Sequence, residues 1–202
     1  MEGHGIPNNL MQNFDPIAIL VAVPLLDRIV YPLLRRHQIR FLPISRITVG
    51  FFVASLAMMY AAIVQDMIYK APPCYKSPLC DLSIVDGVKQ GNKVHIAIQA
   101  PAYMFIGLAE VFLSVSGLEY AYMKAPERLK SFVQSLFLLT NAFGAAIGMA
   151  LTSVAYDPAI QWMYVGLCCT AVITSLIFWL LFRNLNNEED KFNALDKHYD
   201  EK

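Results

Sequence analysis

The sequence predicts an all-α integral membrane protein with five transmembrane helices. Of its 202 residues, 56% are hydrophobic and only 16% are charged, whereas about 25% of residues are charged in a soluble domain. Five apolar segments approach the length of about 20 residues that a helix needs to cross a bilayer. They are too long and too uniformly apolar for barrel strands, which alternate over about 10 residues. The net charge of zero gives no indication of nucleic-acid binding.

The five segments are expected to form a single bundle over residues 16–182. They cover residues 16–34, 47–69, 94–122, 132–156 and 160–182. The first segment starts at Asp15 and Pro16, which is an ordinary helix start with a capping acid and a proline in the first turn. Pro24 lies inside the same segment and should kink the helix, because proline has no N–H to donate.

The Lys and Arg residues in the connections between the segments predict the orientation of the chain in the membrane. Lys and Arg are concentrated in residues 35–46, in residues 124–130 and in the acidic tail, residues 183–202. Since positive residues favour the cytoplasmic side, these parts should be cytoplasmic. Residues 1–15 and the long loop of residues 70–93 should then be extracellular.

The four cysteines fall into two pairs. Cys74 and Cys80 lie in the loop predicted to be extracellular, where a disulfide is favoured and two free thiols are the alternative. Cys168 and Cys169 lie inside the last segment and are expected to be small packing residues. No His lies at ligand spacing from either pair, so the sequence predicts no metal site.

Glu110 is the main candidate for a functional residue. It lies in an otherwise uncharged apolar run of residues 94–118, and a charge at the bilayer centre costs about 2.5 kcal/mol or considerably more. On a helical wheel, small or polar residues share its face: Tyr103, Gly107, Ser114 and Gly117. Such a face permits close helix packing or lines a hydrated cavity. A structural hydrogen bond from Glu110 to a neighbouring helix is the alternative.

Two further groups could contribute to a site. Glu119, near the inner end of the same segment, is expected to be an interfacial or gating ion-pair partner. In the fourth segment Gln134, Phe137 and Asn141 could line a polar cavity or pack against another helix, while Gly144 and Gly148 favour helix packing. No hydrolase nucleophile arrangement and no Gly-rich phosphate loop is present, so an enzyme is not expected.

Several motifs resemble the C-terminal part of the proton-dependent oligopeptide transporter family, in particular its fungal members. They are HGIPNNLMQNFDP (4–16), PLLDRIVYPLL (24–34), ASLAMMYAAIVQ (54–65), AEVFLSVSGLEYAYMKAP (109–126) and KSFVQSLFLLTNAFG (130–144). The resemblance covers nearly the whole chain and is weakest in the outer loop and the tail. It implies that the five segments correspond to helices eight to twelve of a twelve-helix major facilitator transporter.

The resemblance also implies roles for individual residues. Glu110 matches the family glutamate that lies in the central cavity and engages the amino terminus of the peptide. Asp15 stands where the family often has an amide, which changes the charge at that position. Phe137 matches a common tryptophan, and it can form the wall of a side-chain pocket without donating an indole hydrogen bond. The family's coupling acids lie in its first and seventh helices, and neither position falls within this chain.

The sequence therefore predicts a C-terminal fragment of a proton-coupled di/tripeptide symporter of the plasma membrane. The proton is the coupling ion, and no cofactor is expected. Expected partners are di/tripeptides, the lipid bilayer, and the missing N-terminal half or a full-length relative. The chain alone is not expected to transport. The alternative is a small multispan interaction or regulatory protein that pairs with a full-length transporter.

Overall fold

The structure is a computed structural model that describes residues 13–37, 41–76, 80, 84–85, 88–89 and 91–200. For residues 84–85, 88–89 and 186–200, only the backbone is described. Within these ranges five helical spans are long and apolar enough to cross a membrane, which confirms the predicted fold class. Most of the predicted segment 1–15 lies outside the described residues.

Two of the five spans contain a π-helical segment. The first consists of α2 (Phe14–Leu25), the π-helical segment η1 (Leu26–Val30) and α3 (Tyr31–Arg36). The third consists of the 3₁₀ turn η3 (Ile96–Gln99), α5 (Ala100–Glu110), the π-helical segment η4 (Val111–Val115) and α6 (Ser116–Lys124). The second span is the single helix α4 (Pro43–Lys70). The sequence predicted helices and a kink at Pro24, and it did not predict the π-helical turns η1 and η4.

The remaining elements show where the expected ends of the segments shift. The fourth span is the short 3₁₀ turn η5 (Glu127–Leu129) followed by α7 (Lys130–Thr152), which ends before residue 156. The fifth, α8 (Ile160–Asp200), continues as a helix through most of the predicted hydrophilic tail. Between the second and third spans, β1 (Ile84–Val85) and β2 (Val88–Lys89) form a minimal antiparallel hairpin.

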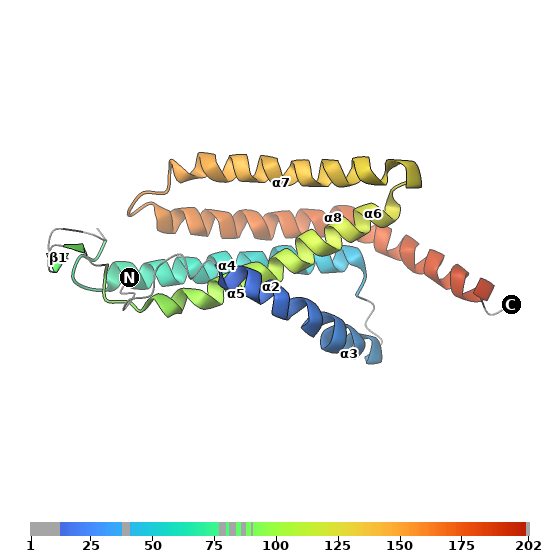
Figure 1. Ribbon diagram of the computed structural model, residues 1–202, viewed down its shortest axis with the longest axis horizontal. Coiled ribbons are helices and arrows are strands. Elements are labelled where there is room, and N and C mark those ends of the chain that lie inside the picture. The colour runs from blue at the N-terminus through green and yellow to red at the C-terminus, as the bar shows by residue number, and fades with distance from the viewer. Residues whose placement is uncertain are drawn as a thin grey trace.

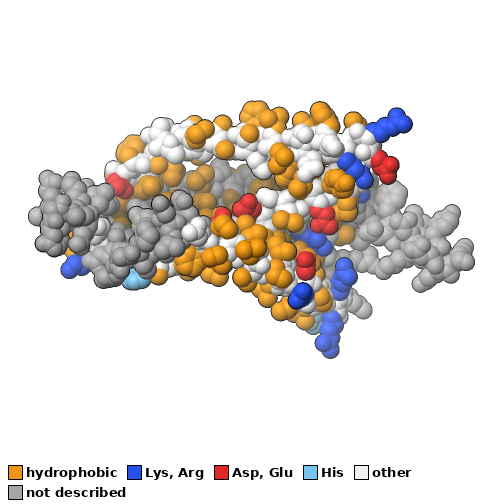
Figure 2. All heavy atoms as spheres, viewed as in Figure 1, with side chains coloured by type: hydrophobic (Ala, Val, Ile, Leu, Met, Phe, Trp, Pro, Cys, Tyr) orange, Lys and Arg blue, Asp and Glu red, His pale blue; other side chains and the backbone are white. Residues whose placement is uncertain are grey.

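Helix α4 is the centre of the bundle. It packs along α8 and α5, and α2 packs on α5. Helix α7 lies along one edge of the bundle and contacts α6 (Figure 1). None of its residues is buried within the described chain. Apolar side chains cover the spans, and Lys and Arg gather mainly near α3 and the α6–α7 connection (Figure 2).

The two π-helical segments meet in a buried apolar cluster. Ala22 and Leu26 of the first span pack with Val111 and Phe112 of the third. The ring of Phe41 meets that of Phe112 edge-on, with centroids 6.0 Å apart. Pro24, which cannot donate a backbone hydrogen bond, lies just before η1. Such π-helical turns are rare and often occur at functional sites.

The outer loop is held against the end of α4 by a buried amide. The Asn92 side chain is fully buried. Its Nδ2 donates to the carbonyl oxygens of Ile68 (2.7 Å) and Tyr75 (2.9 Å), and its Oδ1 accepts from the Cys74 amide at 3.3 Å. Cys74 and Cys80 form a disulfide with their Cα atoms 5.6 Å apart. The loop therefore has a fixed base at this end of the bundle.

We expect Asn92→Ala to lower the free energy of unfolding by about 2 kcal/mol or more. The substitution removes three hydrogen bonds, two of them buried, and a partner lost in a buried site costs about 1–3 kcal/mol. Unfolding of the full chain in detergent micelles measures the change. Asn141→Ala, at an exposed asparagine, is the matched control and should be nearly neutral. Equal effects of the two substitutions would show that the Asn92 contacts do not hold the loop.

Candidate functional site

The face of the third span around Glu110 is formed at a close approach to α2. A Cβ atom built on Gly107 would lie 2.9 Å from Asp15 Oδ1 and 2.9 Å from the Ala18 Cβ. Only a residue without a side chain permits this distance. Gly107 is three residues before Glu110, so the two positions are neighbours on the helix surface. The structure thus places Asp15 beside the turn that carries Glu110.

The same span is bordered by α7 two turns further along. A Cβ atom built on Gly117 would lie 3.2 Å from Phe137 Cε2, so the phenyl ring packs over this glycine. Asn141 follows Phe137 by one helical turn and is exposed. Glu110 is also exposed. Glu110 therefore lies between a stretch contacted by α2 and a stretch contacted by α7.

Asp15 has an unusual environment. Its Oδ1 is buried and has no hydrogen-bond partner among the described residues. Buried acceptors are normally paired, so an unpaired one calls for an explanation. The Asp15 side chain as a whole is half-buried. Together with the exposed carboxylate of Glu110, it gives this side of the bundle two acidic groups that can accept hydrogen bonds from a cationic ligand.

Glu119 lies away from the face that carries Glu110. It belongs to a second polar cluster, which includes Arg46. Its Oε2 forms an ion pair with Arg46 Nη1 at 3.9 Å. The Arg46 Nε also donates to the Phe41 carbonyl at 3.0 Å, and the guanidinium lies 4.3 Å from the centroid of the Tyr31 ring. A cavity of about 280 Å³ adjoins these groups and is also lined by Asp27 and Ser116.

The sequence pattern alone did not single out Arg46 as the partner of Glu119. Their expected positions in the membrane could have suggested the pair. Arg46 lies at the start of its span and Glu119 near the end of another, so both belong at the same membrane surface. Their pairing agrees with the ion pair expected for Glu119. A gating role for Glu119 stays a prediction.

We expect Arg46→Ala to destabilise the chain more than Glu119→Gln. Arg46 makes a charged hydrogen bond and a cation–π contact, worth about 1–3 kcal/mol together. Glu119 is 55% exposed, and an exposed ion pair contributes about 0–1 kcal/mol. A double-mutant cycle of unfolding free energies in micelles measures the coupling. If the coupling energy were as large as the whole effect of Arg46→Ala, the ion pair with Glu119 would account for all of the stabilisation by Arg46, which would contradict this expectation.

The glycines of the fourth span, which were expected to pack against another helix, have no such neighbour in the described chain. No other side chain or backbone atom of the described chain lies within 4 Å of a Cβ built on Gly144 or Gly148. The expected packing at these glycines is therefore absent within the described chain. Among the described residues, no group of three His, Cys, Asp or Glu side chains could hold a metal ion.

The described part of the chain is a helical membrane bundle with an acidic residue exposed on one of its spans. Comparison with known proteins identifies which kind. A model of the POT family matches residues 1–182, and the chain belongs to this family. Membership in a transporter family also confirms that the chain is not an enzyme.

Several relatives are similar over the whole chain. It is 46% identical to "Peptide transporter PTR2" of Saccharomyces cerevisiae, covering 97% of this chain and 31% of that protein. It is also 46% identical to "Peptide transporter PTR_C" of Candidozyma auris, covering 100% of this chain and 35% of that protein. The chain thus spans about a third of the length of these relatives.

Solved structures share the fold. The POT family transporter PepTSo matches with a TM-score of 0.66 at 18% identity, over 85% of this chain and 32% of that one. An auto-inhibited POT family peptide transporter matches with a TM-score of 0.65 at 22% identity, over 84% of this chain and 32% of that one.

Proposed function

We propose that this chain forms the C-terminal part of a proton-coupled di/tripeptide symporter. The observation that supports this most strongly is Glu110, an acid in a membrane span of a POT family member, exposed on a face that α2 and α7 border. A peptide amino terminus is a compact cation. A carboxylate binds such a group by charge-assisted hydrogen bonds, which are about twice as strong as neutral ones.

The neighbours of Glu110 fit the same ligand. Asp15 is a second acceptor one helix away, and the Phe137 ring offers an apolar wall for a peptide side chain. Asn141, one turn beyond Phe137, can donate to or accept from a peptide bond. We assign these four residues to the substrate-contacting face of the intact transporter.

The exposed surface of α7 supports the proposal that a second helical bundle is needed for transport. Alternating access requires one bundle to rock against another around the binding site. Gly144 and Gly148 have open space above them, which suits close approach by helices that this chain does not contain. We expect the chain alone to be inactive for this reason.

We also propose a location and an orientation. Lys and Arg gather near α3 and the α6–α7 connection. Positive residues favour the cytoplasmic side, so this end should be cytoplasmic, together with the end of α8. The loop with the disulfide then faces outside, where an oxidising environment preserves it. The plasma membrane is the location that fits these features, and the proton gradient across it is the driving force.

Uptake of a radiolabelled dipeptide at acidic external pH tests the function. We expect background uptake by cells that produce the chain alone. Uptake should appear when the chain is co-produced with the N-terminal two thirds of the S. cerevisiae relative. Robust uptake by the chain alone would contradict the fragment interpretation. Reduced uptake by a co-produced full-length relative would instead favour a regulatory protein.

A further inference from the structure

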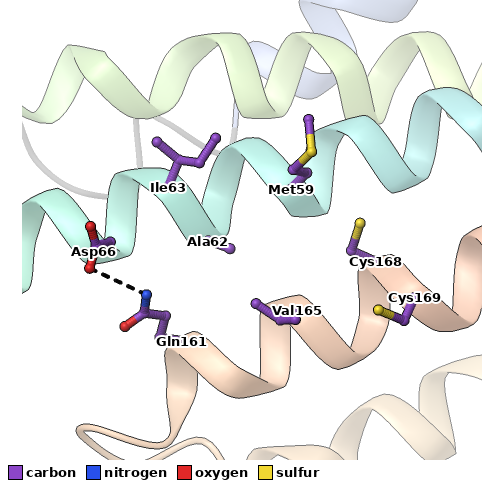
Figure 3. A pocket seen from close by; sticks show the side chains of 8 residues that line it. All are labelled: Met59, Ala62, Ile63, Asp66, Gln161, Val165, Cys168 and Cys169. Atoms are coloured by element: carbon purple, nitrogen blue, oxygen red, sulfur yellow. Dashed lines mark hydrogen bonds between the residues drawn. The ribbon is translucent and has the colours of Figure 1, made fainter.

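A cavity of about 340 Å³ lies between α4 and α8, away from the proposed substrate face. Apolar side chains and two cysteines line most of it, and two polar groups lie at one end (Figure 3). The lining residues are Met59, Ala62, Ile63, Asp66, Gln161, Val165, Cys168 and Cys169. Ile63 and Val165 are exposed and Cys168 is partly exposed, so the cavity opens on the surface of the bundle.

The polar end of the cavity lies at a membrane surface. Asp66 is in the last turn of α4, which ends at Lys70, and Gln161 is in the first turn of α8. Asp66 Oδ2 accepts from Lys70 Nζ at 2.5 Å, and Asp66 Oδ1 accepts from Gln161 Nε2 at 3.4 Å. The Lys70 side chain is 75% exposed. An ammonium group has three donors, so Lys70 can bind Asp66 and a second anion at once.

The groove, together with Lys70 one turn beyond its polar end, matches the depth of one leaflet. Met59 precedes Lys70 by 11 positions along a helix that rises about 1.5 Å per residue, which separates them by about 16 Å. Half of a bilayer hydrocarbon core is about 15 Å thick. The surface from Lys70 through the groove to Met59 therefore runs from the depth of the lipid headgroups to about the middle of the membrane, and it changes from polar to apolar in the same direction.

From this match we infer that the groove between α4 and α8 is a binding site for a zwitterionic glycerophospholipid. An acyl chain lies along Met59, Ile63 and Val165, and the phosphate contacts the ammonium of Lys70. The carboxylate of Asp66 accepts the positive group of the headgroup. The charges of Asp66 and Lys70 cancel, so the site complements a headgroup with both charges and offers no net attraction to an anionic lipid.

Lipid retention by the purified full chain tests this inference independently of transport. Native mass spectrometry would compare protein mixed with phosphatidylcholine and with phosphatidylglycerol in detergent. We expect the unmodified chain to retain phosphatidylcholine preferentially. Val165→Phe, which fills the groove, should reduce that retention several-fold. Ile173→Phe, on the same helix and outside the lining, is the matched control and should leave retention unchanged.

A second variant separates lipid binding from misfolding. Lys70→Gln changes an exposed side chain and leaves the apolar groove intact. It should reduce retention of both lipids, because both carry the phosphate that Lys70 contacts, and it should keep the preference for phosphatidylcholine, because Asp66 still faces the positive group of that headgroup. Equal retention by the Val165 and Ile173 variants would overturn the inference, as would unchanged retention of phosphatidylcholine in Lys70→Gln. Failure of dipeptide uptake would not bear on this result, because the measurement involves no peptide.

Discussion

Glu110→Gln should weaken dipeptide binding by at least about tenfold in a chimera in which this chain replaces the matching part of the S. cerevisiae relative. The substitution keeps the shape of the side chain and one acceptor oxygen but removes the charge. A hydrogen bond to a charged group contributes about 1.5–3 kcal/mol, and 1.4 kcal/mol corresponds to a tenfold change in affinity. Binding of a labelled dipeptide to membranes from cells that produce the chimera measures the loss.

A matched acid elsewhere on the same span serves as the control. Glu119→Gln also removes one carboxylate from the third span, but Glu119 pairs with Arg46 at the end of the bundle. Its effect on dipeptide affinity should be small. Unchanged affinity in Glu110→Gln would remove Glu110 from the substrate-contacting face. A larger effect of Glu119→Gln would place the peptide in the cavity near Arg46 instead.

Gly107→Leu should destabilise the full chain by about 1–3 kcal/mol, the usual cost of overpacking a close contact. The new Cβ would lie 2.9 Å from both Asp15 Oδ1 and Ala18 Cβ, so α2 must move away from α5. Gly144→Leu introduces the same side chain into a span where the described chain leaves open space. It should be neutral or slightly stabilising, because glycine is a poor helix former.

Thermal or denaturant unfolding in micelles compares the two leucine variants directly. A large cost at Gly107 with none at Gly144 supports the close α2–α5 contact that sets the position of Asp15. Equal costs at both glycines would mean that α2 does not approach α5 this closely, and Asp15 would then lose its assigned position beside the turn of Glu110.

The existence and number of the membrane spans could be predicted from the sequence because hydropathy over about 20 residues is a strong signal. The residues at which the helices begin and end were less predictable. The last helix passes through the acidic tail because Glu, Lys and Leu are good helix formers, whatever their polarity. The segments η1 and η4 were not predicted, since one extra residue in a turn leaves no mark on a hydropathy profile.

The site was predictable only in part. A charge in an apolar run identifies Glu110, and the glycines on its face indicate close contacts, which Gly107 makes with Asp15 and Gly117 with Phe137. The periodicity of small and polar residues along a helix shows which face makes contacts. It does not show which helix supplies them, because that depends on tertiary packing. The Gly144 and Gly148 expectation failed within the described chain because a small-residue motif indicates that a helix can be approached, without specifying the partner.

The central claim is that this chain supplies the C-terminal helices and the ammonium-binding acid of a peptide transporter. Uptake of a radiolabelled dipeptide at acidic external pH by the chimera with the S. cerevisiae relative tests it most directly. We predict uptake well above that of cells with empty vector, and its loss on Glu110→Gln. A chimera that reaches the cell surface in normal amounts and takes up no dipeptide would contradict the account.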